Sequence, residues 1–193
     1  LEPSNCMLIV DESFLDFTDK KEQISLEQDI DKYPNMAILK SMSKAYGICG
    51  LRIGYLLTAN IEFAQAVRNG IHIWNINGFA EEFLRILPQY KKEFEESCEV
   101  VKVDRDVFYK ELCAIEGMIV FKPDANYIYC RLPDDALSGP EVCKRLFIKH
   151  NIYIKDSAGK TQPDGDRYIR IASRTQEENS TLIIGLKEVM YGK

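Results

Sequence analysis

The chain has 193 residues, which is enough for one or two domains with a buried core. Its 46% hydrophobic and 28% charged residues are typical of a soluble globular protein, and its net charge of −5 argues against a nucleic-acid surface. No apolar run approaches the ~20 residues that cross a bilayer. We therefore expect partners that are neither nucleic acid nor membrane.

The six cysteines are spread along the chain without a CxxC pair. This spacing does not match a zinc site, and a disulfide framework is not expected in a chain of this size. We expect no metal, mostly buried thiols and a reducing cytoplasmic environment. Because the first residue is Leu1, we also expect the chain to be trimmed at its start.

Three short apolar runs come first, at residues 6–10, 36–39 and 52–58, with helical patterns at 25–33 and 60–68. Such runs are typical of strands buried on both faces of a parallel sheet. The first run ends at Asp11 and the second at the loop that carries Lys44. Ligands bind at the carboxyl ends of parallel strands, so we expect Asp11 and Lys44 to share a site.

Helical spacing follows at residues 79–87 and over a long segment, 89–115. Strand patterns then occur at 118–121, 127–132, 152–155 and 168–172, with helical patterns at 139–149 and 175–190. The order predicts an α/β fold. It comprises part of a large domain with a mostly parallel sheet (1–88), an interdomain helix (89–115) and a small α+β domain with an antiparallel sheet (116–193).

Lys44 lies in the stretch Ser41–Gly54, among small hydroxyl and glycine residues. A lysine nucleophile must lose its proton, which requires burial or a neighbouring cation. The alternative is a solvated loop lysine. Ser41, Ser43 and Arg52 add hydroxyls and a fixed cation beside it, so the pattern indicates an anchor for a carbonyl cofactor that carries a phosphate.

Two further residues have competing interpretations. Asp11 is either a counter-ion that keeps a pyridine nitrogen protonated, or a helix cap or structural ion pair. Arg170, in the run 168–172, either binds a substrate carboxylate through its planar fork or faces water on an edge strand. Arg174, four positions on, is a second candidate.

Four motifs together carry a family resemblance. The chain resembles the class I/II, fold-type I pyridoxal-phosphate aminotransferases, in the branch of histidinol-phosphate aminotransferase and threonine-phosphate decarboxylase, and it matches their carboxy-terminal half only. The matching motifs are Asp11-Glu12-Ser13-Phe14, Ser41 to Gly54, Asp124-Ala125-Asn126-Tyr127, and Arg170-Ile171-Ala172 ahead of Glu177-Glu178-Asn179.

The resemblance implies pyridoxal 5'-phosphate as the cofactor and a role for each matched residue. It implies that Lys44 forms the Schiff base and moves the proton, and that Asp11 pairs with the ring nitrogen. It assigns the cofactor phosphate to Ser41, Ser43 and Arg52, and the substrate carboxylate to Arg170, with Asn126 nearby. Phe14 stands where this branch usually has a tyrosine that contacts the cofactor's phenolic oxygen, so it leaves the reaction type open.

The implied function is transfer of an amino group between an amino acid and a 2-oxo acid through Lys44. The alternatives are a decarboxylase or lyase for an amino acid or its phosphate, and a non-catalytic assembly module. A half sheet exposes a strand edge. We therefore expect a homodimer or pairing with the missing amino-terminal half, and weak or no activity from residues 1–193 alone.

Overall fold

A computed structural model describes residues 6–192 and divides the chain into two compact units, Leu1–Cys98 and Glu99–Lys193. The division lies inside the long helix α5 (Lys91–Cys113), which matches the helix predicted at 89–115. No helix in the described part of the chain is both long and apolar enough to span a bilayer.

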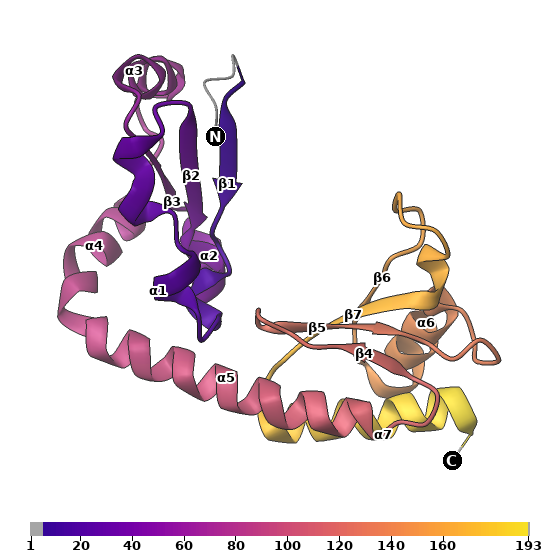
Figure 1. The fold of residues 1–193 in the computed structure, drawn as a ribbon. Helices are drawn as coiled ribbons and strands as arrows, with labels where there is room; N and C mark the ends of the chain where they lie inside the picture. Colours follow the sequence, from indigo (N-terminus) through magenta and orange to yellow (C-terminus); the bar gives the residue numbers. More distant parts are fainter. Residues whose placement is uncertain (1–5, 193) are drawn as a thin grey trace. The chain divides into compact units, whose positions relative to one another are not determined.

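The first unit contains a three-stranded sheet in the order β1 (Leu8–Asp11), β2 (Met36–Ser41), β3 (Gly54–Thr58), shown in Figure 1. β1 is parallel to β2, whereas β3 is antiparallel to it. The prediction of burial on both faces is correct for the start of β2, where Met36 is 0% exposed, but wrong for β1, where Ile9 is 56% exposed. Within residues 6–192, β1 and β3 are the edge strands of this sheet, so each lacks a neighbouring strand on one side.

The helices of the first unit are short. They are α1 (Lys21–Ile24), α2 (Met42–Ala45), α3 (Ile61–Gly70) and α4 (Gly78–Ile86), with 3-10 turns η1 (Leu15–Phe17), η2 (Glu27–Lys32), η3 (Cys49–Leu51) and η4 (Leu87–Tyr90). The helix predicted at 25–33 is the 3-10 turn η2. The sequence missed α1 and α2 because four residues are too few to show helical periodicity. Asn60 and Asn77 cap α3 and α4 by accepting backbone N–H groups.

The apolar core of the first unit is small. One cluster combines Ile30, Met36 and Ile38, and the other combines Met42, Ile53 and Ala80. The second cluster packs α2 against α4, so it supports the turn that carries Lys44. Apolar side chains remain exposed after α3, where Trp74 is 93% exposed.

The second unit contains an antiparallel sheet in the order β4 (Ile119–Phe121), β5 (Tyr127–Arg131), β7 (Tyr168–Ala172), β6 (Lys155–Asp156). β6 is later and shorter than the strand predicted at 152–155. Asn151 has a left-handed backbone that ends the preceding helix, and the Ile152 N–H bonds to Leu146 O at 3.3 Å. Ile152 is therefore bonded to the end of the preceding helix, and the strand begins only at Lys155.

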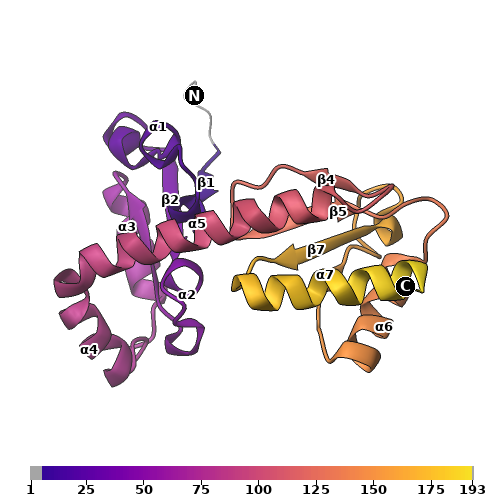
Figure 2. The same cartoon turned by 90° about the horizontal axis from the view of Figure 1, so that it is seen from below.

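Helices cover one face of this second sheet. α6 (Gly139–His150) and α7 (Gln176–Tyr191) pack beside β7 (Figure 2), and the last turns of α5 complete the layer. The core is made of side chains that are 0% exposed on all of these elements, among them Phe108, Leu112, Ile128, Leu146 and Leu186. The alternate strand residues, including Tyr129 and Arg170, therefore lie on the opposite, open face.

Candidate active site

The carboxyl ends of β1 and β2 lie at one edge of the first sheet. The strands are parallel, with Asp11 opposite Leu39, and the Glu12 N–H bonds to Leu39 O at 2.9 Å. β2 ends at Ser41, and α2 with Lys44 begins at once. The structure thus brings the aspartate motif and the lysine motif to the same edge, as the parallel strands predicted.

A chain of hydrogen bonds joins the two motifs through Ser13. The Ser13 N–H donates to Asp11 Oδ1 at 2.9 Å, and Ser13 Oγ accepts the Ser41 N–H at 2.8 Å. Ser41 Oγ in turn caps α2 by accepting the Ser43 N–H at 3.3 Å. Ser13 is only 3% exposed. The carboxylate of Asp11 is therefore fixed relative to the turn that carries Lys44 by Ser13, for which no separate role was predicted.

Lys44 and Asp11 are both exposed in the first unit. The ammonium of Lys44 lies 5.8 Å from the centroid of the Phe14 ring. Among residues 6–192, neither Lys44 nor Asp11 forms an ion pair. The interpretation of Asp11 as part of a structural ion pair therefore has no support in the described residues, and both charged groups are available to a ligand.

Arg52 has a strained backbone for a non-glycine residue, with φ of 58° in the left-handed region. Its Nη1 donates to Cys49 O at 3.1 Å. Gly54, two residues on, pairs with Ser41, and a Cβ there would lie 2.6 Å from Lys40 O, so only glycine allows this approach of β3 to β2. Strain of this kind is common at functional positions.

These groups fit the cofactor that the resemblance implies. An amine, a carboxylate, a guanidinium and two hydroxyls correspond to the aldehyde, the ring nitrogen and the phosphate of pyridoxal phosphate. The roles of Lys44, Asp11, Phe14, Ser41, Ser43 and Arg52 remain predictions. The geometry adds that their backbone segments are held together by hydrogen bonds.

A buried charged cluster beside this edge was not predicted. Asp16 Oδ1 lies 2.6 Å from Lys21 Nζ and 3.5 Å from Lys40 Nζ, while Asp16 Oδ2 is buried without a hydrogen-bond partner in the described residues. Burial, the largest single cause, lowers the pKa of Lys21, but the hydrogen bond to Asp16 and the negative charge of Asp16 together outweigh it, so the pKa of Lys21 is raised. Lys40 lies within β2 and Asp16 lies within the 3-10 turn η1, and no sequence pattern pairs them.

In the second unit, Asn126 directly precedes β5, and Arg170 lies on β7, the strand that pairs with β5. Asn126 O accepts the Ser173 N–H at 2.9 Å, and the guanidinium of Arg170 lies 5.0 Å from the centroid of the Tyr127 ring. β7 is an inner strand, so the interpretation of Arg170 as an edge-strand arginine is wrong. Its side chain is exposed on the open face of the sheet.

Arg170 lines a cavity of about 430 Å³, here named the basic pocket. Its lining residues are Tyr127, Tyr129, Lys155, Asp156, Ser157, Lys160 and Arg170. Lys155 lies directly opposite Arg170 in the β6–β7 register, an arrangement that is repulsive for like charges. None of the three cations forms an ion pair within the described part of the chain. Asp156 is the one carboxylate in this lining, so the three cations leave an excess of positive charge that suits an anion with more than one charge.

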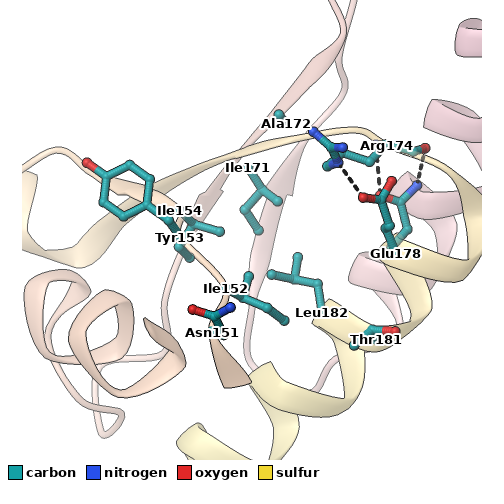
Figure 3. A pocket seen from close by; sticks show the side chains of 11 residues that line it. Asn151, Ile152, Tyr153, Ile154, Ile171, Ala172, Arg174, Glu178, Thr181 and Leu182 are labelled. Atoms are coloured by element: carbon teal, nitrogen blue, oxygen red, sulfur yellow. Dashed lines mark hydrogen bonds and ion pairs between the residues drawn. The ribbon is translucent and has the colours of Figure 1, made fainter. Parts of the chain in front are cut away.

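A second cavity of about 350 Å³ lies between β7 and α7 (Figure 3). Its apolar lining includes Ile152, Ile171 and Leu182. Arg174 lies at its rim, where Nε donates to Glu178 Oε1 at 2.9 Å, and Arg174 lowers the pKa of Glu178. Glu178 also forms the capping box of α7 with Thr175. Arg174 thus belongs to the helix cap.

Three comparisons with known proteins bear on these sites. Residues 1–185 match the family model described as aminotransferase class I and II. The chain is 38% identical over 186 residues to CMP-5'-(3-aminopropyl)phosphonate synthase of Streptomyces rubellomurinus, covering 96% of this chain and 29% of that protein. It is 33% identical to L-serine phosphate decarboxylase of Sulfurospirillum multivorans, covering 95% of this chain and 47% of that protein.

The fold matches as well. The histidinol-phosphate aminotransferase of Clostridium acetobutylicum superposes with a TM-score of 0.87 at 32% identity, over 95% of this chain and 54% of that one. The chain therefore spans about half or less of the relatives it matches. The expected fold-type I architecture and the expected cofactor of the family, pyridoxal phosphate, are confirmed. The chain belongs to the class I and II aminotransferase family of pyridoxal-phosphate-dependent enzymes.

Proposed function

We propose that the whole protein is a pyridoxal-phosphate-dependent enzyme that decarboxylates an amino acid carrying a phosphate or phosphonate group. The observation that carries this proposal is the basic pocket, where Lys155, Lys160 and Arg170 lack carboxylate partners in the described residues. A substrate with a carboxylate and a phosphate would supply the missing negative charge. The names of the relatives support this substrate class, since they include a serine phosphate and a phosphonate.

Each cation suits a different part of such a substrate. The planar fork of Arg170 matches a carboxylate, and its stacking on Tyr127 restricts its orientation. Lys155 and Lys160 are point charges on long stems and suit the oxygens of a phosphate. We assign the carboxylate to Arg170 and the phosphate to the two lysines.

The remaining chemistry belongs to the first unit. Pyridoxal phosphate, when bound, supplies a ring that accepts the electron pair of a bond broken at the substrate α-carbon. Asp11 would hold the proton on the ring nitrogen, and Ser41, Ser43 and Arg52 would bind the cofactor phosphate. Lys44 Nζ would anchor the cofactor and deliver a proton to the α-carbon after carbon dioxide leaves. The balanced change is loss of carbon dioxide and gain of one proton.

Transamination is the second candidate. The family model and the aminotransferase of known structure favour it, and Lys44 would then remove the α-proton. Phe14 favours decarboxylation, because it lacks the hydroxyl that aminotransferases of this branch place beside the cofactor. The experiment is product analysis with L-serine phosphate and the full-length protein. Release of carbon dioxide without a 2-oxo acid supports decarboxylation, whereas stoichiometric 2-oxo acid formation with an amino acceptor excludes it.

We also propose a cytoplasmic homodimer. The segment after α3 exposes Ile73 and Trp74 to 94% and 93%, and Phe79 on α4 is 82% exposed. Exposed apolar side chains of this size are typical of a surface covered by another chain. All six cysteines are free thiols, which suits a reducing compartment. Sedimentation of the full-length protein tests the dimer, and a monomer at micromolar concentration would contradict it.

A further inference from the structure

A polar loop at residues 157–165 connects β6 to β7 beside the basic pocket. Its two ends are fixed to each other, since the Ser157 N–H bonds to Tyr168 O at 3.0 Å, and the second end is closed as a local turn by the Arg167 N–H, which bonds to Asp164 O at 2.8 Å. A Cβ on Gly165 would lie 2.5 Å from Ser157 O, so the two arms of the loop touch where only glycine fits. The base of this loop is therefore rigid.

The tip of the loop carries Lys160 and is held differently. The Tyr129 hydroxyl donates to Gln162 Oε1 at 2.7 Å and lies 3.1 Å from Ser157 Oγ. Within the described part of the chain, Gln162 is the only side chain between residues 158 and 163 that hydrogen-bonds to the sheet. The Tyr129 ring is itself stacked on Tyr168, with centroids 5.3 Å apart. The Lys160 N–H also bonds to Ser157 O at 3.2 Å, so the loop tip is held by this turn at its base and, beyond Lys160, by the hydrogen bond from Tyr129 to Gln162.

Lys160 lies two residues from Gln162 and lines the basic pocket with Lys155 and Arg170. Lys155 and Arg170 lie opposite each other in the β6–β7 register, so in the absence of an anion their charges disfavour a third cation, Lys160, beside them through like-charge repulsion. The hydrogen bond between Tyr129 and Gln162 opposes this repulsion and keeps Lys160 in position before a ligand arrives. A site that is organised in advance loses less conformational entropy on binding.

We propose that Tyr129 and Gln162 form a latch that positions Lys160 over the basic pocket and so sets the affinity for the substrate phosphate. Both are positioning residues, because they act through Lys160. The inference rests on the proposed function, since the phosphate is the group that Lys160 would meet. It adds two residues and a loop to the determinants of substrate specificity.

The test uses the full-length holoenzyme and the variants Tyr129→Phe, Gln162→Ala and their double mutant. Tyr129→Phe keeps the stacked ring and removes only the hydroxyl. Each single variant should weaken inhibition by inorganic phosphate and raise KM for L-serine phosphate about fivefold, with kcat little changed. The double mutant should be no worse than either single variant, because both remove the same bond. Tyr153→Phe is the matched control, since Tyr153 is 82% exposed and lies outside the pocket.

Limited trypsin digestion gives a readout independent of turnover. Cleavage after Lys160 should be faster in both variants than in the wild type and in Tyr153→Phe. Additive effects on phosphate inhibition, or an unchanged cleavage rate, would overturn the latch. If the wild type neither binds inorganic phosphate nor converts L-serine phosphate, the proposed function fails. The cleavage rate then decides on the latch alone, with faster cutting in both variants supporting it and equal rates refuting it.

Discussion

The buried pair of Asp16 and Lys40 allows a prediction of a stability loss whose size depends on which partner is removed. Asp16 is 6% exposed and Lys40 is 7% exposed. Asp16 Oδ1 has a second cation, Lys21, at 2.6 Å, whereas Lys40 has no other carboxylate among the described residues. Removing Lys40 therefore leaves Asp16 compensated, while removing Asp16 leaves a buried ammonium alone.

The expected magnitudes follow from this asymmetry. Asp16→Asn should cost roughly 3–5 kcal/mol in the free energy of unfolding, the range for an uncompensated buried charge. Lys40→Met keeps the length of the side chain and should cost only about 1 kcal/mol. The double mutant should recover much of the loss of Asp16→Asn, because the unpaired charge is gone. Asp29→Asn is the control, since its pair with Lys32 is exposed and is worth at most about 1 kcal/mol.

Urea denaturation of the full-length protein, followed by circular dichroism, measures these differences at constant slope. Equal decreases in the free energy of unfolding for Asp16→Asn and Lys40→Met would show that the asymmetry between the two partners is wrong. So would a double mutant that is less stable than Asp16→Asn. Asp16 lies two residues after Phe14, and its partner Lys40 directly precedes Ser41; both Phe14 and Ser41 are predicted to contact the cofactor. Asp16→Asn should therefore also weaken cofactor binding, as measured by cofactor absorbance after dialysis.

Three other predictions follow from the two units. Arg170→Lys keeps the charge but loses the planar fork, so it should raise KM by about tenfold or more in steady-state assays, and an unchanged KM would exclude carboxylate binding by Arg170. Residues 1–193 alone should bind pyridoxal phosphate weakly, and an equilibrium titration that shows full-length affinity would contradict this. Burial raises the pKa of the Cys143 thiol to about 11 and that of Cys130 to about 12, whereas Cys49 is exposed. Iodoacetamide at pH 8 should therefore modify the exposed thiols of Cys6, Cys49 and Cys113 before those of Cys130 and Cys143. Because the unfolded thiols ionise near 9.0, the free energy of unfolding should fall as the pH rises from there.

The element types were largely predictable from the sequence, and the local exceptions have physical causes. The apolar runs located β1, β2 and β3, and their carboxyl ends located Asp11 and Lys44. Burial could not be predicted for β1, because an apolar run does not reveal whether a neighbouring strand is present. α2 was missed because it has only four residues.

The supporting residues of the site were harder to predict than the residues that would contact a ligand. Ser13 acts through a backbone N–H of Ser41, and a bond of that kind leaves no pattern in the sequence. The latch between Tyr129 and Gln162 joins residues of β5 and a loop whose contact depends on the register of the sheet. Motif residues such as Lys44 stand out by type and spacing, whereas these partners are defined only by the fold.

The proposed chemistry depends on covalent attachment of pyridoxal phosphate to Lys44, and this attachment can be measured. The full-length protein would be incubated with pyridoxal phosphate, reduced with borohydride, digested and mapped by mass spectrometry. Lys44 is exposed without an ion pair among the described residues, whereas Lys40 is buried beside Asp16. We expect one stoichiometric pyridoxyl adduct on Lys44. An adduct on Lys40 or another lysine, or none at all, would contradict it.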